Sequence, residues 1–289
     1  MSASMFRIAS RVAAAIAAFA AVAGAASPPG PLPPTGMVAL AQSDQRLFVM
    51  LRIGAGEILP MIFDTGSDGH SIDRLAVRHN RLRTIGATIE HDGTTGRRRA
   101  LHTVAITDAS LGGLSVGTIE AAALDYDRDD AMGIVSPQLF AGRLVRLDLA
   151  RNRAAIVEKT AATIPPTPAS PYLGGLPATD LVLPDGKTIR ANLDTGYNGE
   201  LSLPLAMMTT LPLIAPATVV GRFRSIDASG EVFGGQIRGT VRIGPLTLES
   251  PHVTFLGNVA NVGLPLIRRT TLLLDPADQR SWLLPLGPR

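Results

Sequence analysis

The tripeptide Asp-Thr-Gly occurs twice in this sequence of 289 residues, at positions 64–66 and 194–196. Each copy follows a hydrophobic stretch, 59–63 or 189–193, that leads directly into the aspartate. Composition alone gives an expectation of roughly 0.1 such tripeptides, so one copy could arise by chance, but two copies in matching contexts are hard to dismiss. Two carboxyl groups at the ends of buried strands indicate a shared catalytic pair.

Two carboxyl groups supply both functions that hydrolysis of a peptide needs in the absence of a metal. One removes a proton from water, and the other donates a proton to the carbonyl oxygen or to the leaving amine. When two such groups lie about 3 Å apart they cannot both ionise, so they share one proton and titrate as a coupled pair. We assign Asp64 and Asp194 to this pair; the sequence leaves open which of them carries the proton.

The two halves of the chain align with a shift of 130 residues (194 − 64 = 130). Gly69 then falls on Gly199, and Gly133 and Gly263 each lie 69 residues after their aspartate (133 − 64 = 69; 263 − 194 = 69). Each half continues with an apolar run that ends in an acid. Because an internal repeat preserves more than its motif, we interpret each half as one copy of a unit of about a hundred residues.

These features resemble the aspartic proteases of the pepsin and retropepsin kind over residues 42–287, most closely bacterial retropepsin-like proteases with two fused lobes. In that family each lobe supplies one Asp-Thr-Gly loop, and a hydrophobic-hydrophobic-Gly segment braces the loop from behind. The resemblance implies a mainly β, bilobal acid-protease fold, with two homologous β-barrel-like lobes and an active-site cleft between them. It further implies an aspartic-type endopeptidase, a hydrolase that acts on polypeptides.

The same resemblance assigns structural roles to the loop residues. The hydroxyl groups of Thr65 and Thr195 are expected to form hydrogen bonds across the lobe interface. Gly66 and Gly196 permit a tight loop and bring backbone N–H groups close to the carboxylates.

Gly133 and Gly263 would let a strand pass close behind each loop, although both can also be read as ordinary strand-end glycines. Ser67 in the first loop matches the family pattern, whereas Tyr197 stands where serine or alanine is usual. If Tyr197 blocks the water site or the pairing of the loops, the chain is instead a non-catalytic peptide-binding module on the same fold. A second alternative is an active site formed between two chains.

The substrate is expected to lie extended in the cleft and to pair with the backbone as an added strand. Two segments could form covering hairpins, 90–103 and 223–235. The residues proposed for their tips are Gly93, Thr94, Thr95 and Gly96 in the first hairpin and Ser229 and Gly230 in the second.

The N-terminal segment 1–26 has the pattern of a signal peptide: Arg7 and Arg11 precede an apolar run, and small residues follow it. The run is shorter than the about 20 residues that span a bilayer, so we expect export to the periplasm or beyond and no integral span in the mature chain. Retention as an uncleaved anchor is the alternative.

Composition and punctuation suggest the remaining organisation. Residues 27–41 are expected to be a Pro-rich leader, 42–160 the N-terminal lobe, 161–178 a Pro/Gly-rich linker, and 179–289 the C-terminal lobe. Helical signal is limited to 73–82 and 204–210.

Charge and composition exclude several classes of partner and cofactor. Removal of two arginines with the signal would lower the formal charge from +3 to about +1 (3 − 2 = 1), which leaves no strong field for nucleic acid. The five histidines form no compact zinc motif, so we predict neither metal nor cofactor. The chain has no cysteine, hence no disulfide, and we expect a fused-lobe monomer.

Overall fold

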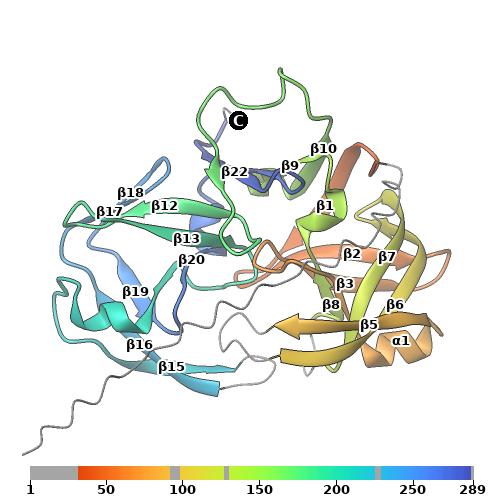
Figure 1. The fold of residues 1–289 in the computed structure, drawn as a ribbon, viewed down its shortest axis with the longest axis horizontal. Helices are drawn as coiled ribbons and strands as arrows, with labels where there is room; N and C mark the ends of the chain where they lie inside the picture. The colour runs from red at the N-terminus through yellow and green to blue at the C-terminus, as the bar shows by residue number, and fades with distance from the viewer. Residues whose placement is uncertain (1–31, 92–97, 127–129, 225–228, 288–289) are drawn as a thin grey trace, which may run out of the picture. The chain divides into compact units, whose positions relative to one another are not determined.

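The protein is mainly β, which confirms the fold class that the short, alternating apolar runs predict. Both halves belong to one compact unit, Leu32–Arg289 (Figure 1). The expected signal peptide and the start of the leader lie outside the described residues. The computed structural model describes residues 32–91, 98–126, 130–224 and 229–287, without the side chains at 90–91, 98–99, 223–224 and 229.

Six of the described strands of the first half close into a barrel, in the order β2-β3-β8-β4-β7-β6 and back to β2. Alternation explains the inward face of β2: Leu47, Val49 and Leu51 are buried, and the residues between them are not. Pairing of Leu51 with Leu111 closes the ring. The strands are β2 (Leu47–Ile53), β3 (Ile58–Phe63), β4 (Ser71–Asp73), β6 (Arg98–Leu111), β7 (Leu114–Leu124) and β8 (Gly133–Val135), with β5 (Arg83–His91) paired to β6.

The second half repeats much of this order in a sheet of nine described strands. With the shift of 130 residues, β4 falls on β14 and β3 falls on β13, and β13 pairs in parallel with β20 as β3 does with β8. The strands are β12 (Ala178–Val182), β13 (Thr188–Asp194), β14 (Leu201–Leu203), β15 (Thr218–Arg224), β16 (Ser229–Gln236), β17 (Thr240–Ile243), β18 (Leu246–Glu249), β19 (His252–Phe255) and β20 (Ala260–Gly263).

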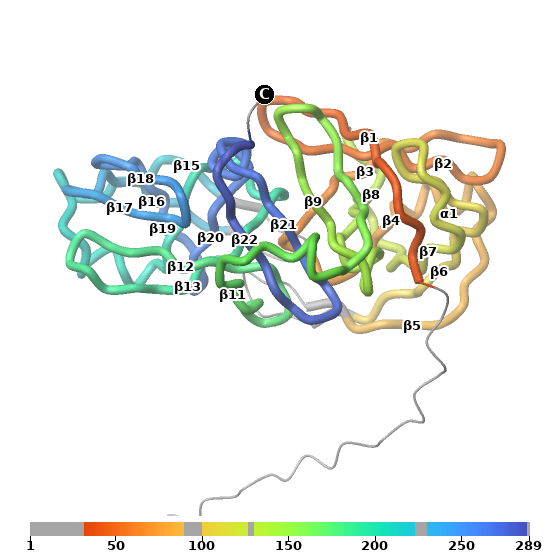
Figure 2. The backbone as a smooth tube through the Cα atoms, turned by 90° about the horizontal axis from the view of Figure 1, so that it is seen from above, coloured from red at the N-terminus to blue at the C-terminus, as the bar shows by residue number. Residues whose placement is uncertain are grey.

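A third group of strands joins the two halves. Strand β9 of the first half pairs antiparallel with β21 of the second, with Leu147 opposite Leu272, and Figure 2 shows β9, β21 and β22 running side by side. The order is β1 (Gly36–Gln42), β10 (Arg153–Val157), β9 (Leu144–Asp148), β21 (Thr271–Asp275), β22 (Arg280–Leu284) and β11 (Ser170–Pro171).

This joining sheet includes two segments that sequence reasoning placed outside the lobes. Residues 36–41 of the expected leader form most of β1, because Val38 and Leu40 alternate into the core while the backbone pairs with β10. Within the expected linker 161–178, Ser170 and Pro171 form β11 against β22, and Ala178 begins β12. Backbone pairing with distant strands, which local composition does not encode, accounts for both differences.

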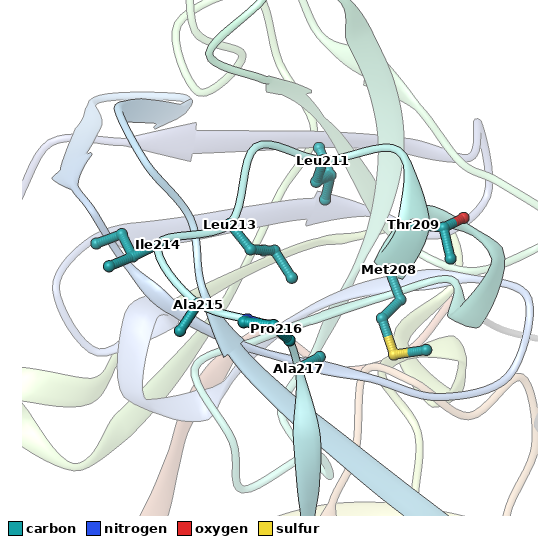
Figure 3. Close-up of a pocket in the computed structure, with 8 residues that line it drawn as sticks. All are labelled: Met208, Thr209, Leu211, Leu213, Ile214, Ala215, Pro216 and Ala217. Carbon is teal, nitrogen blue, oxygen red and sulfur yellow. The ribbon is translucent and has the colours of Figure 1, made fainter.

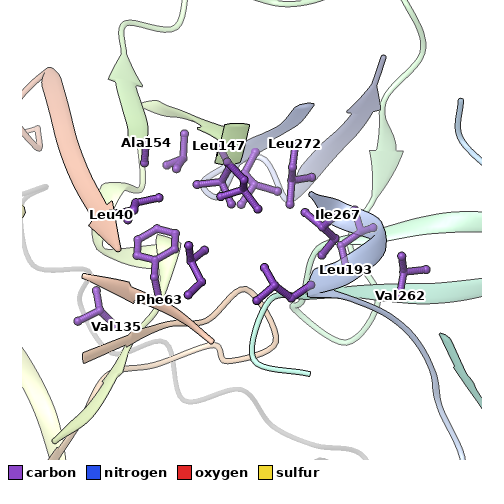
Figure 4. Packing of buried hydrophobic residues seen from close by; sticks show 14 of the residues in the cluster. Leu40, Phe63, Val135, Leu147, Ala154, Leu193, Val262, Ile267 and Leu272 are labelled. Atoms are coloured by element: carbon purple, nitrogen blue, oxygen red, sulfur yellow. The ribbon is translucent and has the colours of Figure 1, made fainter. Parts of the chain in front are cut away.

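One hydrophobic core extends through both halves (Figure 4). It includes Phe63 and Leu193, the residues that immediately precede the two aspartates, and both are fully buried. Leu147 and Leu272 add the joining sheet to the same cluster. The ends of β3 and β13 are therefore anchored in shared apolar packing.

Helices are short in the described part of the chain. Helix α1 (Arg74–His79) lies within the expected segment 73–82, and its N-cap Asp73 accepts the Leu75 N–H at 2.6 Å. In the expected segment 204–210 the structure has a 3₁₀ helix, with Pro204 as its N-cap. The others are α2 (Leu264–Ile267) and the 3₁₀ helices η1 (Pro137–Phe140), η2 (Leu149–Arg151) and η3 (Leu205–Thr209).

Candidate active site

The two Asp-Thr-Gly loops are bonded to each other through their threonines. The Thr65 N–H donates to Thr195 Oγ1 at 3.0 Å, and the Thr195 N–H donates to Thr65 Oγ1 at 3.0 Å. The Thr65 hydroxyl donates to the Leu193 carbonyl at 2.5 Å, and the Thr195 hydroxyl donates to the Phe63 carbonyl at 2.7 Å. Each fully buried hydroxyl thus both donates and accepts, so neither is left unsatisfied.

The carboxyl groups of Asp64 and Asp194 are hydrogen-bonded to each other. Each also packs on the glycine of the opposite loop. A Cβ atom added at Gly66 would lie 2.5 Å from Cγ of Asp194, and one added at Gly196 would lie 2.6 Å from Oδ2 of Asp64. Only glycine leaves room for the opposite carboxyl group at these positions.

Backbone N–H groups orient the two acids unequally. The Gly66 N–H donates to Oδ1 of Asp64 at 2.7 Å. In the second loop the N–H groups of Gly196 and Tyr197 both donate to Oδ1 of Asp194, each at 2.9 Å. The pair is consequently not symmetric, although the two loops share a motif.

Burial raises the pKa of both carboxyl groups. For Asp194 burial, followed by the negative charge of Asp64, raises the pKa to about 8. Burial also raises the pKa of Asp64, against the N–H groups of Gly66 and Gly196, the hydrogen bond with Asp194 and the positive charge of Arg46. The pair is therefore arranged to hold one proton near neutral pH, preferentially on Asp194.

Tyr197 packs behind its own loop. A Cβ atom at Gly199 would lie 2.2 Å from the Tyr197 hydroxyl oxygen, and one at Gly263 would lie 2.7 Å from Cδ1 of the ring. The hydroxyl group is within hydrogen-bond distance of Thr254 Oγ1, 2.7 Å. The tyrosine thus fills space that the two glycines leave open.

Gly263 and Gly133 lie where strands approach closely. A Cβ atom at Gly263 would lie 1.9 Å from the Gly199 carbonyl oxygen, directly behind the second loop. Gly133 has φ +153°, and a Cβ atom there would lie 2.1 Å from the Ser71 carbonyl oxygen. Neither site accommodates a side chain without moving backbone.

Sequence reasoning missed Ser136, which braces the first loop from the end of β8. Its hydroxyl donates to the Ser67 carbonyl at 2.6 Å, and its N–H donates to Nδ1 of His70 at 3.1 Å. Burial lowers the pKa of His70 to about 4, so the imidazole is neutral and can accept this bond. The signal available was the position of Ser136, three residues after the repeat glycine Gly133.

Sequence reasoning also missed two arginines that cross between the halves. Arg46, after β1, donates from Nη1 to the Gly196 carbonyl at 3.3 Å and pairs with Asp130 at 3.7 Å. Arg268, after α2, donates to Oε1 of Gln42 at 2.8 Å and to the Asp44 carbonyl at 3.2 Å. No local motif marks these residues, because their partners lie in the other half of the chain.

The two expected covering hairpins have paired strands, β5 with β6 and β15 with β16. In the second hairpin Gly230 pairs with Phe223, and Ser229 begins β16. The proposed tip residues of the first hairpin, Gly93, Thr94, Thr95 and Gly96, lie outside the described residues.

A cavity of about 640 Å³ opens beside the acid pair, with Asp194 and Gly66 in its wall. Another pocket, of about 470 Å³, is formed by the single segment 208–217 (Figure 3). None of its eight lining residues is titratable, and Asp64 and Asp194 are not among them.

Neither a protein-family model nor a curated protein sequence matches this chain. Among the described residues, no three His, Cys, Asp or Glu side chains come together as a metal-ligand set. Within the same residues, no helix is both long and apolar enough to cross a membrane.

Proposed function

We propose that this protein is an aspartic endopeptidase with a bilobal, retropepsin-like fold. The observation that carries the proposal is the contact between Asp64 and Asp194, two buried acids from matching loops that are hydrogen-bonded to each other. Two carboxyl groups that share one proton provide a general base and a general acid in a single site.

The unequal surroundings of the two acids suggest their starting roles. Asp64 feels the positive charge of Arg46, whereas the negative charge of Asp64 opposes ionisation of Asp194. Ionised Asp64 then removes a proton from the attacking water, and protonated Asp194 donates its proton to the carbonyl oxygen of the substrate. Collapse of the tetrahedral intermediate returns a proton to the leaving amine and restores the pair.

The threonine bonds and the joining sheet support this proposal because they hold the acids in one geometry. Catalysis by a preorganised pair depends on atomic positions within about 0.5 Å. The hydrogen bonds of Thr65 and Thr195 use buried partners on both loops. A substrate would lie extended beside the pair and beneath the hairpins β5–β6 and β15–β16.

The alternative, a non-catalytic peptide-binding module, depended on Tyr197 obstructing the pair. The Tyr197 ring instead packs on Gly199 and Gly263, and its hydroxyl group lies at Thr254 on β19. Both acids and both loop glycines are in place. This arrangement favours the enzyme over the binding module.

Cleavage of a diverse peptide pool between about pH 3 and 7 tests the function. We expect the mature protein to cut, and the variants Asp64→Asn and Asp194→Asn, each verified as folded, to lose activity by at least about a thousandfold. Equal cleavage by all three proteins would reject the mechanism. Peptide binding without cleavage by the wild-type protein would support the binding module.

Export and a monomeric state are parts of the same proposal. The first rests on the sequence of residues 1–26, which lie outside the described structure, and the second on the presence of both loops in one chain. Cell fractionation and mass measurement in solution, with activity in the monomer fraction, test these two points.

A further inference from the structure

The cavity beside Asp194 has mainly apolar walls. Leu173 and Leu176, from the connection between β11 and β12, contribute to one wall, and their backbones bond to each other at 2.8 and 3.1 Å. Met207 of η3 and Leu256, after β19, contribute further apolar surface. With a volume of about 640 Å³ and Asp194 in its wall, the cavity is large enough for a bulky side chain next to the acid pair.

Asn192 introduces a buried polar group into this cavity. It lies on β13 two residues before Asp194, so both side chains are on the same face of the strand. The residue is 8% exposed, and its Oδ1 has no hydrogen-bond partner among the described residues. Its counterpart in the first half (192 − 130 = 62) is Ile62, which is 5% exposed. The repeated strand therefore does not require a polar residue at this position.

The other polar side chains of the cavity are differently situated. Arg190 donates to Asp180 at 2.7 Å and to the Pro171 carbonyl. Asn261 donates to Ser202 Oγ at 3.4 Å. Asn258 is exposed to solvent. Asn192 Oδ1 is thus the buried acceptor of this cavity that awaits a donor.

We propose that this cavity binds a bulky, mainly apolar peptide side chain that carries a neutral O–H or N–H donor, such as tyrosine or tryptophan, and that the donor bonds to Asn192 Oδ1. This assignment of substrate class rests on the proposed protease function. An unpaired buried acceptor weakens the free protein and also any complex that leaves it unpaired. Sites built to hydrogen-bond a substrate hydroxyl discriminate strongly against analogues without it. The nearby Arg190 disfavours a cationic donor.

Matched peptides that differ only by tyrosine or phenylalanine, placed in turn at each position around a cleavage site, test this specificity. At one position we expect kcat/KM for tyrosine to exceed that for phenylalanine by about tenfold, the usual size of a hydrogen bond to a buried group. Asn192→Ile, which copies the first half, is expected to abolish or reverse this preference. Asn258→Ala removes an exposed amide from the same cavity, so the tyrosine-to-phenylalanine ratio is expected to persist.

Failure of this proposal is distinguishable from failure of the protease function. Calorimetric binding of the same peptides, made with a reduced, uncleavable bond, tests the cavity even if no peptide is cut. If Asn192→Ile fails to fold, Asn192→Leu replaces it with a side chain of closely similar shape. The same ratio in wild type and variant, or no tyrosine preference at any position in cleavage and binding, would overturn the proposal. A lack of cleavage with tyrosine-selective binding would overturn only the protease function.

Discussion

At the scale of single residues, the site depends on groups that have no substitute of equal size. The Thr65 and Thr195 hydroxyls each satisfy two buried backbone groups, one in each loop. Gly66 and Gly196 leave space for the opposite acid. The acids are therefore positioned by residues that carry no charge.

Thr65→Val is expected to destabilise the protein by about 2–4 kcal/mol, because it keeps the shape but leaves the Leu193 carbonyl and the Thr195 N–H buried without partners. Urea unfolding measures the change. Thr65→Ser is the control: it keeps the hydroxyl and loses one methyl group, at a cost of about 1 kcal/mol. Equal losses for both variants would contradict this role of the hydroxyl.

Gly66→Ala is expected to lower kcat/KM by at least about a hundredfold, because its methyl group would displace the Asp194 carboxyl group 2.5 Å away. Gly69→Ala, three residues later, meets nothing within 4 Å and is expected to leave kcat/KM within about twofold. Steady-state kinetics compares the two variants. Similar kinetics would show that the glycine contact does not position the acid.

The acid pair also predicts a specific pH dependence of stability. Because the pKa of Asp194 is raised from 3.8 to about 8, the folded protein holds a proton that the unfolded chain releases. Its contribution to stability is therefore present at low pH and lost as pH rises through about 8. His70 has the opposite sign, since its lowered pKa makes stability fall as pH drops from 6.5 towards 4.

Between pH 6.5 and 8, where His70 is neutral in both states, the free energy of unfolding is expected to fall with pH. The slope for one proton is at most about 1.4 kcal/mol per pH unit. Asp194→Asn is expected to remove most of this slope, and His70→Gln is expected to retain it. Urea titrations at several pH values measure it, and an unchanged slope in Asp194→Asn would refute the assignment.

At the scale of secondary-structure elements, strands β8 and β20 support the loops from behind. Ser136, at the end of β8, bonds to the first loop, and Gly263, at the end of β20, touches the second. Their different chemistry shows that the repeat conserves the position of the support and not its bonds.

Gly263→Ala is expected to destabilise the protein by more than about 3 kcal/mol, because the new methyl group would lie 1.9 Å from the Gly199 carbonyl oxygen. Gly86→Ala in β5 meets nothing within 4 Å, so its stability is expected to change by less than about 1 kcal/mol. Thermal unfolding compares the variants. Equal effects would mean that β20 can move away from the loop without loss.

At the scale of the whole described unit, the halves share a sheet and a core. The pairing of β9 with β21 and the single hydrophobic cluster couple their stability. We expect one cooperative unfolding transition, with fluorescence of Trp282 in β22 coinciding with far-ultraviolet circular dichroism. Two separated transitions would show that the halves unfold independently.

The sequence by itself determined the mainly β class, the repeat and the two Asp-Thr-Gly loops, because these depend on local alternation and on residue types at fixed spacing. Only the tertiary structure decided that residues 36–41 and β11 belong to a joining sheet, since their partners are distant strands. It likewise brought Arg46, Ser136 and Asn192 to the site. Their side chains have no local signature, and their contacts arise only when separated segments pack against one another.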